Sequence, residues 1–161
     1  MQTQELKDLW ERFEFVRKEL LTLLEGATDE DLTYVPAGFR NPAAVIARHL
    51  AGAELYWIGQ VVGGRDAQRN RDAEFSRPLW SRAWLLEALS KSRDLSAEVF
   101  RELDGASLDG PPASPLPIKP PYAPDPLTRR WALLHLLEHE AYHLGQLSLL
   151  LRIARESGAQ V

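Results

Sequence analysis

Three of the four histidines of this chain recur at every fourth position near its C-terminal end. His135, His139 and His143 lie in the run LLHLLEHEAYHLGQLSLLLR. Residues four apart in a helix lie one turn along and only about 40° around the axis, so neighbouring rings in this row point toward a common place. Two neutral imidazoles placed in this way are a typical pair of ligands for a divalent metal ion. The spacing therefore predicts a metal site, provided that another element supplies a third ligand.

The fourth histidine, His49, is the candidate third ligand. It lies midway along a predicted helix, in line with Val45 and Ala53, and so at the edge of the apolar face of that helix. Facing helices of a bundle build metal sites from inward-pointing side chains, and three nitrogen ligands with one open position are typical of a catalytic site. The chain has no cysteine, which excludes thiolate ligands and disulfides. The alternative is that these histidines are hydrogen-bonded core or surface residues without a metal.

The same run also contains the metalloprotease pattern HExxH, with Glu140 as its glutamate. In that pattern two histidines bind zinc and the glutamate is the general base. The context disfavours a peptidase, because Gly145 is one position off the extended pattern and no strand is predicted that would bind a peptide. Glu140 is then expected to be a neighbour of the metal ligands or a solvated carboxylate.

Four amphipathic stretches predict the helices that position these residues. No alternation typical of a strand competes with them, and the chain has no internal repeat. Its 161 residues are enough for one domain with its own core. We therefore expect an all-α fold, an up-down-type four-helix bundle over residues 1–161 with one long proline-rich crossover between its third and fourth helices. The helices are predicted at about residues 3–26, 42–63, 78–104 and 127–156.

Turn-forming residues mark the predicted helix ends. Gly26 and Gly63 are expected to end the first two helices, and Asn41 is expected to cap the second. The last helix is predicted to be capped by Asp125 or Thr128.

The third and last helices each have a predicted apolar stripe that faces the core. These stripes comprise Trp80, Trp84, Ala88, Leu95, Val99 and Leu103 in the third helix, and Leu127, Trp131, Leu134, Leu137, Ala141, Leu144 and Leu151 in the last.

Two connections have distinctive compositions. Residues 63–77, GGRDAQRNRDAEFSR, are polar and lack periodicity, so we expect an exposed loop. Residues 105–126 form the proline-rich connection, in which eight prolines between Pro111 and Pro126 exclude both helix and strand. This segment is either a disordered linker or an ordered strap along the bundle.

Charge and hydropathy limit the classes of partner. The formal net charge of −4 disfavours a broad nucleic-acid surface, which needs clustered and unopposed Lys and Arg. The N-terminal residues are charged from Glu5 onward, and no apolar run approaches the roughly 20 residues that cross a bilayer. We expect a cytoplasmic protein that acts on a small molecule, without nucleic-acid or membrane partners.

Two of these helical segments resemble the DinB/YfiT superfamily of metal-binding four-helix bundles, and the resemblance extends over nearly the whole chain. They are RHLAGAELYW in the second helix and LHLLEHEAYHLGQLSLLLR in the last. The resemblance implies that His49, His139 and His143 are the metal triad, and it leaves His135 outside the triad as a partly buried neighbour. Some relatives carry a glutamate at the position of His139. The matching residues are His49, Trp57, His139, His143, Gly145, Gln146 and Arg152.

The resemblance also implies a DinB-like fold, a divalent metal that is usually zinc or nickel, and frequently a homodimer. Characterised relatives include transferases and isomerases that use low-molecular-weight bacterial thiols, and proteins associated with the DNA-damage response. We therefore expect a metal-dependent transferase that activates a low-molecular-weight thiol. A metal-dependent hydrolase of a small substrate and a non-enzymatic dimeric stress-response module stay open as alternatives. No general base is assigned, and the side chains expected around the pocket or behind the ligands are Glu54, Tyr56, His135, Glu140, Tyr142 and Gln146.

Overall fold

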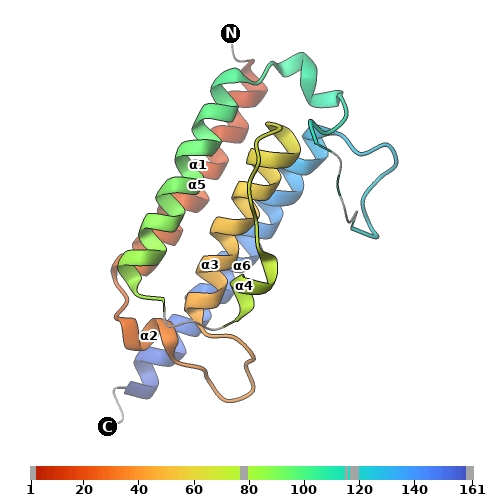
Figure 1. Cartoon of the computed structure of the whole chain (residues 1–161). Coiled ribbons are helices and arrows are strands. Elements are labelled where there is room, and N and C mark those ends of the chain that lie inside the picture. The colour runs from red at the N-terminus through yellow and green to blue at the C-terminus, as the bar shows by residue number, and fades with distance from the viewer. Residues whose placement is uncertain (1–2, 77–79, 115, 117–119, 159–161) are drawn as a thin grey trace.

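Four long helical segments run side by side in this protein, for which we describe a computed structural model (Figure 1). The structure describes residues 3–76, 80–114, 116 and 120–158, and all regular elements in that part of the chain are helical. The second segment consists of an α-helix that continues directly as a π-helix. This confirms the predicted all-α four-helix architecture. The elements are α1 (Gln4–Glu25), α3 (Ala43–Glu54) with η1 (Leu55–Val62), α5 (Arg82–Glu102) and α6 (Arg129–Gly158).

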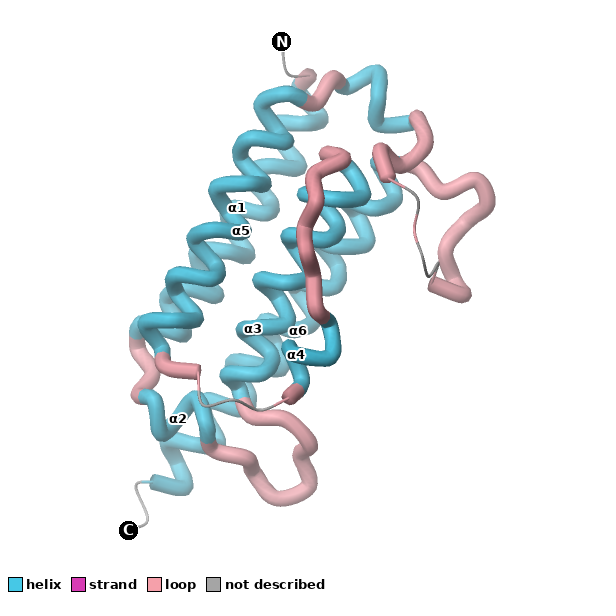
Figure 2. The backbone as a smooth tube through the Cα atoms, in the orientation of Figure 1, coloured by secondary structure: helices cyan, strands magenta, loops and turns pink. Residues whose placement is uncertain are grey.

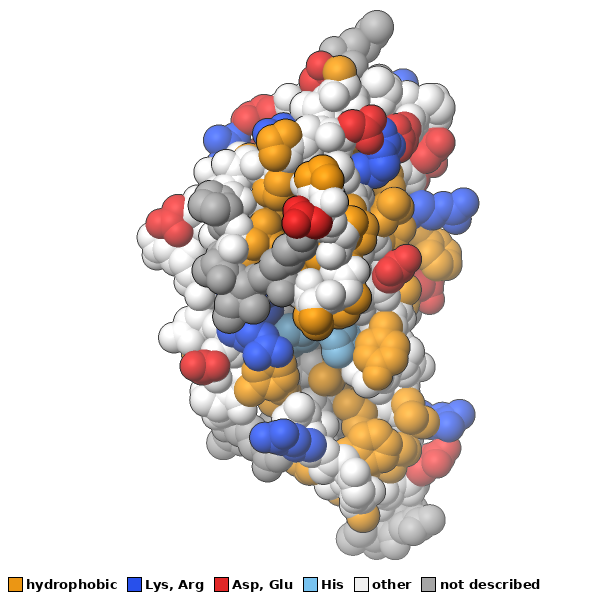
Figure 3. Space-filling model, turned by 90° about the vertical axis from the view of Figure 1, so that its right-hand side faces the viewer, with side chains coloured by type: hydrophobic (Ala, Val, Ile, Leu, Met, Phe, Trp, Pro, Cys, Tyr) orange, Lys and Arg blue, Asp and Glu red, His pale blue; other side chains and the backbone are white. Residues whose placement is uncertain are grey.

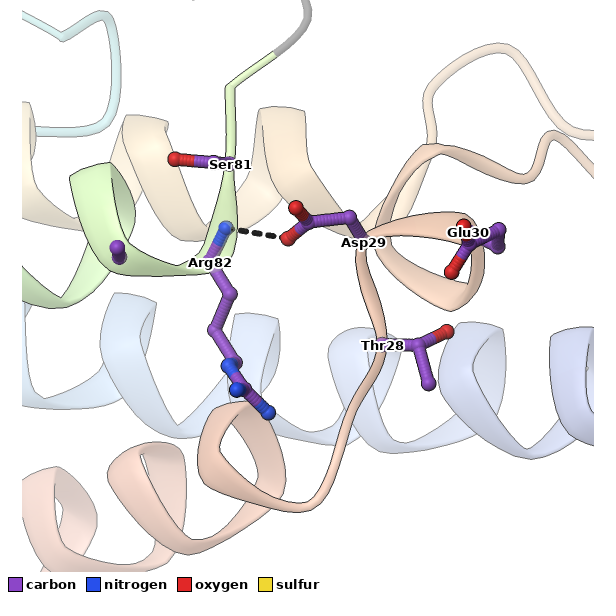
Figure 4. A pocket seen from close by; sticks show the side chains of 6 residues that line it. Thr28, Asp29, Glu30, Ser81 and Arg82 are labelled. Carbon is purple, nitrogen blue, oxygen red and sulfur yellow. Dashed lines mark hydrogen bonds between the residues drawn. The ribbon is translucent and has the colours of Figure 1, made fainter.

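Three short helices complete the described elements: α2 (Asp29–Thr33), α4 (Arg71–Phe75) and the 3₁₀-helix η2 (Gly105–Asp109). Asp29 of α2 accepts a hydrogen bond of 2.7 Å from the backbone nitrogen of Arg82, which begins α5 (Figure 4). The Arg82 guanidinium donates to the carbonyl oxygens of Glu25 and Ala27, at 3.1 and 2.9 Å. These bonds tie the end of α1, α2 and the start of α5 together. A cavity of about 350 Å³ lies there, lined by Thr28, Asp29, Glu30, Ser81, Arg82 and Ala83.

Most predicted helix ends agree with the structure. Gly26 ends α1, and Gly63 ends η1, as expected from the sequence. Thr128 is the cap of α6, because its hydroxyl accepts a hydrogen bond of 3.2 Å from the backbone nitrogen of Trp131. The prediction for Asn41 was wrong. Pro42 itself occupies the cap position of α3, in an extended conformation and without a side-chain acceptor.

The start of the third helix also differs from the prediction. Ser81 caps α5 by accepting a hydrogen bond from the nitrogen of Trp84, so the helix begins at Arg82. The predicted start at residue 78 lies outside the described residues.

The switch from α-helix to π-helix at Leu55 was not predicted. Close packing against α5 accompanies it: a Cβ on Gly59 would lie 2.8 Å from a methyl carbon of Leu95, and one on Gly63 would overlap the side chain of Val99. These glycines allow η1 and α5 to approach each other. Wider π turns are frequent at functional sites, and η1 carries side chains that line a cavity described below.

A layer of polar side chains divides the buried core into two apolar clusters. One cluster is centred on Phe13, Ile58 and Phe100, and the other on Leu24, Leu50 and Leu147. Each long helical segment contributes to the layer. We call it the buried polar layer, and its members are Arg17, Glu54, Ser92, Ser96 and Glu140.

This layer explains why the predicted apolar stripes of α5 and α6 are only partly right. Val99 and Leu103 are buried as expected, but Trp84 and Leu134 are 40% and 43% exposed. The buried faces instead include Leu85 and Leu89 of α5 and Leu133, Leu136 and Leu147 of α6. A stripe defined by apolar residues alone does not find these faces, because buried serines on α5 and a buried glutamate on α6 interrupt them.

The two connections lie differently against the bundle. Residues 63–70 lead back beside α3 to α4, as Figure 2 shows, so this connection returns along the bundle. The predicted exposed loop over residues 63–77 is found only in part: residues 64–70 have no regular structure, whereas Arg71–Phe75 form α4, which packs on α3 and buries Glu74. Residue 77 lies outside the described residues. The described part of the proline-rich connection projects to one side near the ends of α5 and α6 (Figure 1). It contacts the bundle where the nitrogen of Ala113 donates to the carbonyl of Val61 at 2.8 Å.

No helix in the described part of the chain combines the length and the apolar character that crossing a membrane would require.

Candidate metal centre

Three histidines from two helices converge beside the buried polar layer. His49 lies on α3, and His139 and His143 lie on α6. The Nε2 atoms of His49 and His139 are 3.0 Å apart, and the ring of His143 lies 5.1 Å from that of His49 and 4.4 Å from that of His139. Each residue offers one ligand atom, and all three atoms lie within 4.8 Å of one another. This group could therefore hold a metal ion.

A carboxylate fixes the ring of His49. Its Nδ1 lies 2.8 Å from an oxygen of Glu74 in α4, and Glu74 is fully buried. Because a carboxylate only accepts hydrogen bonds, Nδ1 carries the proton and Nε2 presents its lone pair to the centre. Arg69 donates to both oxygens of Glu74, at 2.7 and 2.8 Å. Burial alone raises the pKa of Glu74, but the hydrogen bonds from Arg69 and His49 and their charges outweigh burial, so the pKa lies below its usual value.

The side-chain amide of Gln146 fixes the ring of His143 in the same tautomer, with the proton on Nδ1. Its Nδ1 donates to the side-chain oxygen of Gln146 at 2.7 Å, and the Gln146 amide nitrogen donates to the Tyr142 hydroxyl at 2.8 Å. The Nε2 atom of His143 is therefore the one left to bind a ligand. Burial lowers the pKa of His143, and the hydrogen bond to Gln146 opposes this only in part.

His139 contacts both other rings, with centroids 5.0 Å from that of His49 and 4.4 Å from that of His143. Its Nδ1 is buried and has no hydrogen-bond partner within the described structure. Burial, followed by the charges of His143 and His49, lowers the pKa of His139 to about 3. The ring is therefore neutral at physiological pH, which is the form that binds metals.

The donor set fits a divalent ion held by nitrogen. Nitrogen ligands about 2.0–2.1 Å from a tetrahedral metal lie about 3.3 Å from each other, close to the 3.0 Å between His49 and His139. Metal-binding histidines almost always donate their second N–H to a carboxylate or another acceptor. Glu74 and Gln146 serve as these acceptors for His49 and His143.

His135 lies one turn before the triad, in an aromatic environment. Its ring stacks on Trp131 with centroids 4.8 Å apart and planes at 7°, and it contacts Trp57 edge-on at 4.8 Å. Its centroid is 6.1 Å from that of His139. It does not belong to the group whose ligand atoms converge.

Glu54 and Glu140 do not reach the histidines, although the sequence made both candidates for this site. Both belong to the buried polar layer. Glu54 forms an ion pair with Arg17 and accepts a hydrogen bond of 2.6 Å from Ser92. Burial raises the pKa of Glu140 to about 7, against the opposing charges of Arg17 and Arg93. Glu140 is therefore a buried and not a solvated carboxylate, and Glu54 pairs within the core.

Two cavities meet at the triad, one on each side. The first, of about 530 Å³, lies toward η1 and the proline-rich connection, and its lining includes Tyr56, Trp57, Tyr122 and His135. The second, of about 490 Å³, lies toward the C-terminal half of α6, and its lining includes Tyr142 and Gln146. Both cavities are bordered by His49, His139 and Arg71. Figure 3 views the molecule from the side on which these cavities open, and shows histidine side chains in a hollow among hydrophobic and basic side chains.

Sequence reasoning missed the residues that α4 and the segment before it bring to the site: Arg69, Arg71, Glu74 and Phe75. One signal was present. Asn70 caps α4 by accepting a hydrogen bond of 3.0 Å from the nitrogen of Ala73, and acidic residues follow in the first turn. A capping residue followed by acidic residues is typical of a helix start.

Comparison with known proteins agrees with this fold. The sequence model of the DinB superfamily matches residues 12–147 of this chain. A crystal structure of a DinB-like protein from Bacillus cereus ATCC 10987 superposes with a TM-score of 0.67 at 18% identity, covering 92% of this chain and 91% of that one. None of the curated proteins matches this chain.

Proposed function

This chain belongs to the DinB superfamily, and on that premise we propose that it is a metal-dependent transferase that joins a low-molecular-weight thiol to a second small molecule. In this proposal His49, His139 and His143 would hold one divalent ion, zinc or nickel.

The two cavities that meet at the triad support a transfer reaction. A transferase must hold two organic molecules next to its reacting centre, whereas a hydrolase needs room for one molecule and water. Cavities of about 530 and 490 Å³ share His49 and His139 as part of their walls. Each is within the size range of small-molecule sites.

A divalent ion bound there would lower the pKa of a coordinated thiol, so that the thiolate would be available at neutral pH. The chain has no cysteine, so the thiol comes from a cosubstrate. Glu74 and Gln146 hold the imidazoles of His49 and His143 in the tautomer that leaves Nε2 free. His139, with its lowered pKa, supplies a neutral nitrogen beside them.

The first test is the metal content of protein purified without a histidine tag, measured by elemental analysis alongside the His49→Ala variant. We expect about one equivalent of zinc or nickel per chain, lost in the variant. An empty site that cannot be loaded would contradict the proposal and favour an interaction module.

The second test measures turnover of the metal-loaded protein with an aryl halide whose absorbance changes when a thiol displaces the halide. We expect product only when a low-molecular-weight thiol is added, and none with the metal-free protein. Consumption of an ester substrate without any thiol, combined with no thiol conjugation, would overturn the transferase assignment in favour of a hydrolase.

A further inference from the structure

We infer that one substrate of this centre is a small carboxylic acid with an aromatic or apolar body, and that Arg71 binds its carboxylate. The inference rests on the proposed function only in treating the two cavities as substrate sites.

The charge around the triad is the first observation. The chain as a whole is acidic, with a formal net charge of −4. The linings of both cavities nevertheless contain arginines, namely Arg40, Arg69 and Arg71, and no Asp or Glu among the described residues. A concave surface lined by one sign of charge focuses the field and attracts ligands of the opposite sign. The centre therefore favours an anionic ligand.

Arg69 is already committed to another partner. Its guanidinium donates to both oxygens of the fully buried Glu74, which in turn holds His49. A carboxylate ligand would have to compete with this bidentate pair. Arg69 therefore serves to position Glu74 and is not available for a substrate.

Arg71 has no such partner. No carboxylate of the described residues forms an ion pair with it, and its side chain is exposed at the border of both cavities. Its guanidinium carbon lies 5.2 Å from the centre of the Phe75 ring, and that ring lies 5.1 Å from the ring of His49. Phe75 thus supports the guanidinium next to the triad. A guanidinium is the side chain best suited to bidentate binding of a carboxylate.

The walls of the first cavity define the rest of the ligand. Tyr56, Trp57 and Tyr122 line it together with Ala53 and Pro120. Such walls bury an aromatic or aliphatic body, while a single guanidinium at the rim holds one carboxylate. The combination describes a small aromatic or apolar acid, bound with its acid group at Arg71.

The test compares benzoate with benzamide, which has the same shape and no charge. Binding is measured by ligand-detected NMR or calorimetry on the purified protein and on chelator-treated protein. Chelation separates binding at Arg71 from direct binding of benzoate to a metal. We expect benzoate to bind about tenfold more tightly than benzamide in both samples, because a hydrogen-bonded charge pair contributes about this much. Arg71→Gln should remove the preference, and Arg101→Gln, which alters a remote arginine on α5, should keep it.

Three outcomes overturn the inference: equal binding of the two probes, no measurable binding of benzoate, or a preference that survives in Arg71→Gln. Loss of that surviving preference in Arg40→Gln would assign the carboxylate to Arg40 instead. These outcomes are separate from the failure of the proposed function. A protein that binds no metal but shows the Arg71-dependent preference refutes the metal-dependent reaction and keeps the carboxylate site. A protein that binds metal normally without the preference refutes the inference alone.

Discussion

Glu74 accepts a hydrogen bond of 2.8 Å from Nδ1 of His49, although 25 positions separate the two residues in the chain. The bond joins α4 to the centre of α3 and sets the tautomer of a candidate metal ligand. Acceptors of this kind are typical neighbours of metal-binding histidines.

Replacing Glu74 with Gln tests this relationship. The amide keeps the shape of the carboxylate but loses the charge that orients His49 and pairs with Arg69. We expect zinc affinity to fall about tenfold or more, measured by competition with a chromophoric chelator. Glu102→Gln, which alters an exposed ion pair with Arg65, is the matched control and should leave the affinity unchanged. An unchanged affinity in Glu74→Gln would show that this contact is only structural.

The choice between the histidines of α6 is tested by two alanine variants. His143→Ala should abolish stoichiometric metal binding, because it removes one of the three converging nitrogen ligands. His135→Ala should retain it, since that ring stacks on Trp131 outside the group. The measurement is metal content after dialysis against a low concentration of zinc. The reverse ranking would mean that His135 and His139 are the ligand pair.

Removal of the metal should destabilise the fold, because ligand binding to the folded state alone adds to its stability. At free metal about 100 times the dissociation constant, this contribution is about 2.7 kcal/mol, or a melting temperature several degrees higher in a chain of this size. The test is thermal unfolding at neutral pH with and without a chelator. His49→Ala should show no chelator effect, and a wild-type protein equally insensitive to chelator would speak against metal linkage.

Acid should destabilise the metal-free protein through His139. Its folded pKa of about 3 lies below the value of 6.5 for an unperturbed histidine. The unfolded chain therefore binds the proton first, and the stability present above about pH 6.5 is lost as the pH falls toward 3. Glu140, with a pKa raised to about 7, acts in the opposite direction.

The measurement that isolates His139 is the free energy of unfolding in urea at pH 7 and pH 5, for chelator-treated wild-type protein and for His139→Gln. We expect the wild type to lose more stability between the two pH values than the variant. Identical losses would show that His139 is not protonated preferentially in the unfolded chain.

The stability of the fold is expected to depend on the buried ion pair between Arg17 and Glu54. Both side chains are buried, and Arg17 also donates to the carbonyl of Leu89 at 3.1 Å. Arg17→Ala leaves the Glu54 carboxylate without its partner, so we expect a loss of about 3–5 kcal/mol in the free energy of unfolding. Glu87→Ala, which alters an exposed pair with Lys91, should have no measurable effect. Chemical denaturation of both variants measures the difference, and equal stabilities would contradict this role for the pair.

Local patterns predicted the four long helical segments and the row of histidines along α6. Gly26, Gly63 and Thr128 were readable as helix ends because they act through contacts within one turn of the chain. The row of His139 and His143 was readable because helical spacing alone places both rings together. His49 could be proposed as the facing ligand because it lies at the edge of an apolar stripe, and its ring does lie beside His139.

The residues around the triad could not be predicted in this way. Glu74 is in a polar segment whose burial depends on the packing of α4 on α3. Conversely, Glu54 and Glu140 are adjacent to residues of the site in sequence but point into the buried polar layer. A helix turns by about 100° at each residue, so sequence neighbours of a ligand face other surroundings.

The amino-acid sequence by itself determined the helices and the spacing of the histidines in α6, because both depend on hydrogen bonds and side-chain positions within a few residues. Only the tertiary structure decided which carboxylate holds His49 and that two cavities meet at the triad. It also decided which arginine at these cavities has no ion-pair partner in the described part of the chain. These features depend on how α4, η1 and the proline-rich connection pack against the four long helical segments. The energies that decide such packing come from contacts between residues far apart in the chain, which no local pattern records.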